Sequence, residues 1–266
     1  MTRLGLRTLG AQLTAGCSSP AGAADMASQS LSEQGFCMLQ PDALAKLCEV
    51  PTGACAAAAS FWEALPPDGY LRDGGHYRSR RHGSFIQHLD ASGAAPDLEQ
   101  MPQRAHYQPS TFNALHGGLV RWYPPLDGQL VAMPCFRALV TGLGRVFARQ
   151  RPVRQWFVEA HQFRIDTHGG VGRPTPEGAH RDGVDFVGVV LVQRHGIRGA
   201  ETRVFELDGP YGVRFTLDQP WSALLMDDTR VIHETTPITP INADASGWRD
   251  TLVLTYRATG FMDPPG

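Results

Sequence analysis

The chain has 266 residues, of which 42% are hydrophobic and 19% are charged, and its formal net charge is −2. This composition is typical of a globular protein with a substantial core, and the charge gives no basic excess for nucleic acid or an anionic membrane. The five scattered cysteines form no C-x-x-C pair, which argues against a disulfide framework or a cysteine-ligated zinc and favours the cytoplasm, and no apolar run is long enough to span a membrane.

The first half of the chain is expected to be mainly helical. Residues 1–29 are small and polar without a sustained period, so we expect a disordered tail before a single domain of residues 30–266. A short strand is predicted at 35–39, followed by helices at 41–48 and 54–65. The clearest helix is predicted over 134–150, where a proline fits the first helical position and apolar residues recur at three- and four-residue spacing.

A segment dense in charge follows the second of these helices. On a strand, Arg78 and Arg80 share one face with His76 and His82. Two interpretations remain open. Charge clusters of this kind often form solvated edge strands, whereas guanidinium groups on one face are also suited to a ligand that carries a carboxylate.

The pattern changes to short β-rich runs after Pro152. About eight such runs occupy about 100 residues and leave no room for intervening helices, which favours a sandwich or barrel over βαβ units. We therefore expect a helical N-terminal half packed on a β core of residues 153–260. The predicted runs are 156–165, the segment around His180, 186–192, 202–207, 213–217, 222–226, 231–233 and 251–256.

Three residues in the β region have the character of metal ligands. In an extended chain His180 and Asp182 point to the same side, and His233 ends another apolar run. Two histidines and one carboxylate leave coordination positions open and suit non-haem Fe(II) oxygen chemistry. The chain has 10 histidines, so the His-x-Asp tripeptide is weak evidence by itself.

The last predicted strand adds a cation. It puts Arg249 and Arg257 on the same face as Thr251, Val253 and Thr255. An arginine that enters an apolar strand is costly to bury without an anionic partner. An enzyme that uses 2-oxoglutarate needs a cation for the distal carboxylate, and we expect Arg249 in that role. Arg257 is either a second carboxylate contact or a structural arginine at the rim.

These motifs resemble the Fe(II)/2-oxoglutarate-dependent dioxygenases, and more narrowly the bacterial free amino-acid hydroxylases of the isoleucine 4-hydroxylase type. The resemblance rests on His180-x-Asp182, on His233 and on the trailing run Arg-Asp-Thr-Leu-Val-Leu-Thr-Tyr-Arg at 249–257. It implies a mainly β fold with flanking α-helices, built on a double-stranded β-helix core of the jelly-roll or cupin type. Further matching motifs lie at 161–165, 178–183 and 225–233.

The resemblance also implies cofactors and roles. His180, Asp182 and His233 would ligate Fe(II), and Arg249, together with Arg257, would bind the co-substrate 2-oxoglutarate. O2 would be the oxidant, and ascorbate would serve as reductant in vitro. Related halogenases replace the carboxylate ligand with a small residue, so the presence of Asp182 favours hydroxylation.

The substrate implied by the resemblance is a small free L-amino or imino acid. It would be aliphatic, such as isoleucine or leucine, or cyclic, such as pipecolate or proline, and belong to secondary metabolism. Such a substrate needs a cation or amide for its carboxylate and an acceptor for its ammonium group. For any one candidate residue, a salt bridge or a buried hydrogen bond within the protein is a simpler interpretation than substrate binding. The candidates are Gln162, Arg164, Arg78, Arg80, Arg81 and Arg121, with Asp185 or Glu159 for the ammonium group.

Three alternatives remain at this point. The first is the same chemistry on a peptide or a carrier-bound residue. The second is a non-catalytic β-barrel binding module in which His180 and His233 are packing residues. The third is a metal-dependent, cupin-like enzyme that does not use 2-oxoglutarate. The other histidines, including His161 near the predicted site, are expected to be structural or at the surface, and the sequence does not indicate an oligomeric state.

Overall fold

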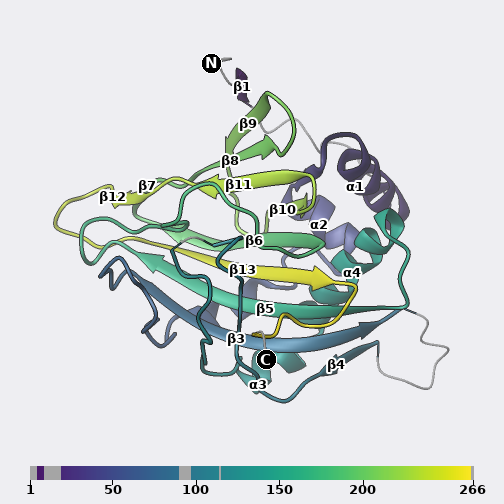
Figure 1. Cartoon of the computed structure of the whole chain (residues 1–266), viewed down its shortest axis with the longest axis horizontal. Helices are drawn as coiled ribbons and strands as arrows, with labels where there is room; N and C mark the ends of the chain where they lie inside the picture. Colours follow the sequence, from purple (N-terminus) through teal and green to yellow (C-terminus); the bar gives the residue numbers. More distant parts are fainter. Residues whose placement is uncertain (1–4, 9–18, 90–96, 114, 265–266) are drawn as a thin grey trace.

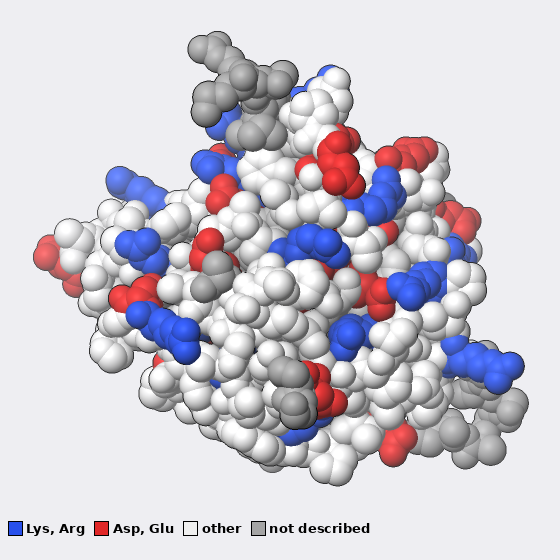
Figure 2. Space-filling view, in the orientation of Figure 1, with Lys and Arg blue, Asp and Glu red and all other residues white. Residues whose placement is uncertain are grey.

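The structure is a computed structural model that describes residues 5–8, 19–89, 97–113 and 115–264 (Figure 1). Most of its regular structure is β, and the described helices lie within the first 150 residues, but strands at 36–39, 78–88 and 98–100 also join the β core, outside the expected range of 153–260. Among the described residues, no helix is both long and apolar enough to cross a bilayer. On the face shown in Figure 2, acidic and basic side chains are interspersed, without a broad patch of one sign.

A seven-stranded antiparallel sheet forms the base of the fold. The central strands are long and mostly buried on both faces, because one face of each packs on the helices and the other faces the opposite sheet. In order, its strands are β2 (Phe36–Leu39), β10 (Ala223–Asp227), β6 (Phe186–His195), β13 (Trp248–Arg257), β5 (Gln155–Asp166), β3 (Arg78–His88) and β4 (Leu98–Gln100).

A smaller sheet lies across the large one and completes a jelly roll (Figure 1). Apolar side chains of both sheets, among them Val187, Leu191, Val204 and Phe215, form one buried cluster between them. The smaller sheet contains β1 (Gly5–Thr8), β9 (Tyr211–Thr216), β8 (Glu201–Glu206) and β11 (Val231–Thr235), and β7 (Ile197–Gly199) pairs separately with β12 (Ile238–Pro240).

The helices cover the outer face of the large sheet. Trp156, Val158 and Ala160 of β5 point toward them and belong to the same core as Phe136 and Phe147 of α4. The intervening residues of β5 therefore face the inside of the jelly roll. The helical segments are α1 (Pro20–Gln34), α2 (Pro41–Leu47), the 3-10 helix η2 (Ala56–Trp62), α3 (Gly128–Ala132) and α4 (Pro134–Gln150).

Several boundaries differ from the expectations. Residues 20–29 belong to α1, because Ser19 caps the helix, Pro20 begins it, and the small residues Ala23 and Ala27 pack against the core. Residues 5–8, also expected in the tail, form β1 and pair with β9, whereas 1–4 and 9–18 lie outside the described residues. The segment 54–65 contains a 3-10 helix, Ala56–Trp62, rather than an α-helix.

The segment around His180 is also not a strand. It makes only an isolated bridge to His233. Gly178 and Gly183, with φ of 80° and 79°, turn the chain on either side of it. The turns leave this segment as a short loop beside β11, which still presents His180 and Asp182 together.

Candidate active site

A cavity of about 140 Å³ lies between the two sheets. Its floor is the inner face of β13, β5 and β3, where strand pairing sets side chains in rows. Arg249 of β13 pairs with Ile165 of β5, which pairs with Arg78 of β3, and the next row contains Thr251, Phe163 and Arg80. The cavity is therefore polar at its floor and carries several charges that come from different strands.

His180, Asp182 and His233 converge on one side of this cavity. The backbones of His180 and His233 exchange two hydrogen bonds, at 3.0 and 2.9 Å, which sets the two rings side by side. Asp182 Oδ1 lies 3.9 Å from His180 Nε2, and its Oδ2 lies 3.8 Å from His233 Nε2. One donor atom from each residue lies within 4.8 Å of the others, so the three can hold one ion on one face.

The loop that carries Asp182 is fixed by the buried carboxylate of Asp228. That carboxylate accepts backbone N–H bonds from Asp182, Gly183 and Val184 at 3.0, 2.8 and 3.1 Å. Burial and the nearby charge of Asp182 raise the pKa of Asp228 to about 7, against the effect of those hydrogen bonds. Gln108 donates to the Asp182 carbonyl at 3.1 Å from the opposite side. Both contacts orient the candidate ligand.

Arg249 is buried on the cavity floor and lacks an acidic partner within the described part of the chain. Its Nε makes no hydrogen bond, and burial, reinforced by the charge of Arg194, lowers its pKa to about 10. The neighbouring Asp250 is engaged elsewhere, by Arg164 at 2.7 and 2.8 Å and by Gln193 at 2.8 Å. Arg249 is thus available to an anion inside the cavity.

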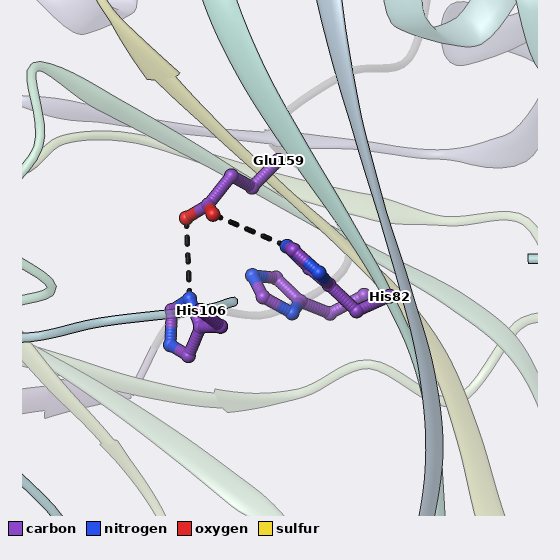
Figure 3. Close-up of side chains that lie close together, drawn as sticks. His82, His106 and Glu159 are labelled. Atoms are coloured by element: carbon purple, nitrogen blue, oxygen red, sulfur yellow. Dashed lines mark hydrogen bonds and ion pairs between the residues drawn. The ribbon is translucent and has the colours of Figure 1, made fainter. Parts of the chain in front are cut away.

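A second polar cluster lies on the β5–β3 side (Figure 3). Glu159 accepts from His82 Nε2 and His106 Nδ1, both at 3.2 Å, and the ring of His161 stacks on that of His82. Burial would raise the pKa of Glu159, but the charges and hydrogen bonds of these histidines outweigh it and hold the carboxyl ionised. Burial lowers the pKa of His106 to about 4 despite Glu159. The cluster therefore places one negative charge among histidine rings.

The predicted Arg78 and Arg80 also line the cavity. Arg78 Nε donates to Asp68 at 2.8 Å, and Arg80 lies between the rings of Tyr123 and Phe163 at 3.8 and 4.3 Å. This arrangement decides against a solvated edge strand, because both arginines are almost fully buried.

The family model for 2OG-Fe dioxygenases matches residues 59–255, which is most of the chain. The chain belongs to the 2OG-Fe dioxygenase family. A bsmA homolog from Methylobium petroleophilum PM1, known from its crystal structure, is 54% identical to this dioxygenase, with a TM-score of 0.86 over 91% of this chain and 96% of that one.

Two further solved structures share the fold with the dioxygenase at low identity. IDO from Bacillus thuringiensis is 16% identical, with a TM-score of 0.71 over 89% of this chain and 100% of that one. The Fe(II)/(alpha)ketoglutarate-dependent dioxygenase TqaL is 18% identical, with a TM-score of 0.67 over 90% and 87%. No curated protein matches the chain.

Membership of the family makes the protein an enzyme that uses Fe(II), 2-oxoglutarate and O2. The donor set fits iron. His180 Nδ1 lies 2.9 Å from the Gly178 carbonyl, to which it donates in the tautomer that leaves Nε2 free as a ligand. His233 is buried with its Nδ1 unpartnered. These findings exclude the non-catalytic binding module and the enzyme without 2-oxoglutarate.

Five residues predicted to bind substrate or co-substrate do not line the cavity, among them Arg81, which donates to the Pro125 carbonyl at 3.0 Å. Gln162 and Arg164 point to the other face of β5, toward Phe61 and Asp250. Asp185 pairs with Arg151 and accepts the Ala258 N–H at 2.7 Å; Arg257, at the end of β13, donates to the Gly260 carbonyl at 2.9 Å.

Sequence reasoning missed the histidine cluster as a cavity feature. Glu159 was already a candidate for the ammonium group, and alternation along β5 could also have found His161, because it shares a face with Glu159, Phe163 and Ile165. His106 carried no such signal, and Arg121, although a candidate for the substrate carboxylate, had no periodic pattern that placed it at the cavity. They belong to an irregular segment that reaches the cavity only through tertiary contacts.

Proposed function

We propose that the protein hydroxylates a small free L-amino or imino acid, aliphatic or cyclic, in a cytoplasmic pathway of secondary metabolism. The observation that supports this most is the small cavity, which joins the candidate iron ligands to separate positive and negative groups. A zwitterion needs both signs of charge, whereas a long apolar or polyanionic substrate does not.

The residues have distinct tasks in this proposal. His180, Asp182 and His233 hold Fe(II), which supplies the oxidation of a C–H bond with O2 while 2-oxoglutarate is converted to succinate and CO2. Arg249 orients 2-oxoglutarate through its distal carboxylate. Valines 184, 189 and 253 line the cavity and exclude water from the reacting atoms. Asp182 occupies a coordination position that a halide would need, which favours hydroxylation.

The test is succinate formation from 2-oxoglutarate with Fe(II) and ascorbate, across a panel of free L-amino and imino acids. We expect one or a few substrates to stimulate succinate release and to gain the mass of one oxygen atom. Succinate at only a low, substrate-independent rate would contradict the free amino acid. Peptides and carrier-bound residues, the alternative substrates, are then tested in the same assay, and coupled hydroxylation of one of them would replace the proposal.

A further inference from the structure

Arg121 has a buried guanidinium group without a hydrogen-bond partner for two of its nitrogens. The residue is 2% exposed and lines the cavity, and neither Nε nor Nη2 is bonded. Its backbone is held in place, because Arg121 and His106 exchange N–H···O bonds at 3.0 and 2.8 Å. Burying an arginine in this state is costly unless an anion completes the site.

The other arginines of the cavity have defined partners or a defined task. Arg78 is paired with Asp68, and Arg80 donates to His161 Nδ1 at 2.6 Å. Arg249 binds the co-substrate 2-oxoglutarate in the proposed function. Within the described residues, neither Arg249 nor Arg121 has an acidic side chain within ion-pair distance. The cavity therefore offers two separate cations for two separate anions, and 2-oxoglutarate accounts for one of them.

Glu159 provides the complementary charge on the same side of the cavity. Arg121 is bonded through its backbone to His106, whose ring donates to Glu159, and the three side chains line the same cavity. His82 and His106 each donate to a different oxygen of Glu159 (Figure 3), which leaves further lone pairs on both oxygens. An ammonium group can bind there without breaking the existing hydrogen bonds.

The same cluster is poorly suited to a second metal ion. Donor atoms of its four residues come within 4.8 Å of one another, but Arg80 donates directly to His161 and its positive charge opposes a cation. The rings of His82 and His161 are stacked, at 4.8 Å and 28°, so their lone pairs run side by side rather than toward one point. A substrate group fits these contacts better than a metal does.

We propose that Arg121 binds the carboxylate of the substrate and that Glu159, oriented by His82 and His106, accepts its amino group. The subsite rests on the proposed function and deepens it. It requires a free α-amino acid, because a residue within a peptide or on a carrier lacks one or both charges. The dioxygenase then distinguishes its two acids by site, with 2-oxoglutarate at Arg249 and the substrate at Arg121.

Kinetics of matched variants separate the two sites. Arg121→Met is expected to raise the KM for the amino acid more than tenfold and leave the KM for 2-oxoglutarate unchanged, with Arg249→Met showing the reverse. Arg203→Met is the control, since Arg203 is paired with Glu201 and Glu234 away from the cavity. An Arg121→Met enzyme with an unchanged KM for the amino acid, or a raised KM for 2-oxoglutarate, would overturn the subsite.

Glu159 is tested with an isosteric change. Wild type should prefer L-isoleucine, or whichever amino acid the panel identifies, over the 2-hydroxy acid with the same side chain. In Glu159→Gln that preference should fall at least tenfold, because the amide no longer attracts the ammonium group. An undiminished preference in a variant that retains its metal would remove Glu159 from the subsite.

Thermal unfolding tests Arg121 without turnover. In protein loaded with Ni(II) and 2-oxoglutarate, L-isoleucine should raise the Tm of wild type but not of Arg121→Met, and L-isoleucinamide should raise neither. Without an amino acid, Arg121→Met should have a Tm equal to or above that of wild type, because the substitution removes an unpaired buried charge. If the panel yields no substrate, the proposed function fails, but the Tm of Arg121→Met without an amino acid still tests the anion site. A Tm below that of wild type would show that Arg121 has a structural role and would overturn the anion site.

Discussion

Arg249 and Arg257 lie at the two ends of one strand, but their surroundings differ. Arg249 is buried in the cavity with a free Nε, whereas Arg257 contacts the chain beyond β13. We predict that Arg249→Met raises the KM for 2-oxoglutarate more than tenfold, as expected when a bidentate charged contact is lost. Steady-state kinetics at saturating amino acid measure this effect, and a larger effect in Arg257→Met would reverse the assignment.

The histidine cluster should make stability depend on pH. The pKa of His106 is lowered by burial to about 4 in the folded state, against an ordinary value of 6.5. Between these values the unfolded chain takes up a proton that the folded protein does not, so stability falls as the pH falls from 6.5 to 4. The loss attributable to this residue is about 3 kcal/mol over the window. Glu159 stays ionised throughout, because its pKa lies well below the window.

His106→Gln removes this titration while keeping a polar side chain at the position. Denaturant unfolding at a series of pH values should therefore give a shallower loss of stability in the variant than in wild type. Arg80, which also faces His106, does not alter the sign, because burial lowers its pKa only to about 10, above every pH in the series. Equal slopes in the two proteins would show that His106 is not the group that titrates.

At the scale of elements, segments with a regular spacing of apolar residues could be predicted from the sequence, whereas segments placed by tertiary contacts could not. Helix α4 has the bounds expected from its apolar spacing and its first proline, and eight of the nine predicted strands lie close to observed ones. The His180 loop was wrongly expected to be a strand. Its two glycines have positive φ, and a hydrophobic pattern does not indicate the φ of a glycine. The segment of His106 and Arg121 has no periodic pattern, and tertiary contacts with β3 and β5 bring it to the cavity.

The packing of α4 on the large sheet gives an element-scale prediction. Phe147 is fully buried and stacks on Phe186 with ring centroids 4.7 Å apart. Phe147→Ala should cost about 3–5 kcal/mol in the free energy of unfolding, through lost burial and the cavity it leaves. Chemical denaturation measures this, with Leu207→Ala at a partly exposed position expected to stay within about 0.5 kcal/mol of wild type. A small effect at Phe147 would mean that α4 does not anchor the sheet.

At the scale of the whole molecule, the candidate iron ligands join parts of the chain that are far apart in sequence. His180 and Asp182 come from the loop before β6, and His233 comes from β11 of the smaller sheet, so an ion bound by all three connects the two sheets. Because the unfolded chain does not hold these ligands together, metal binding stabilises the folded state by mass action, by about 2.7 kcal/mol at a metal concentration of 100 Kd.

We predict that the Tm of the metal-free protein rises as Ni(II) or Fe(II) is added without oxygen. His180→Ala should lose most of that rise, whereas alanine at the exposed His168 should retain it. An equal rise in both variants would show that the ion binds elsewhere. The fold, which the family establishes, would still hold, but the assignment of these three side chains as metal ligands would be wrong.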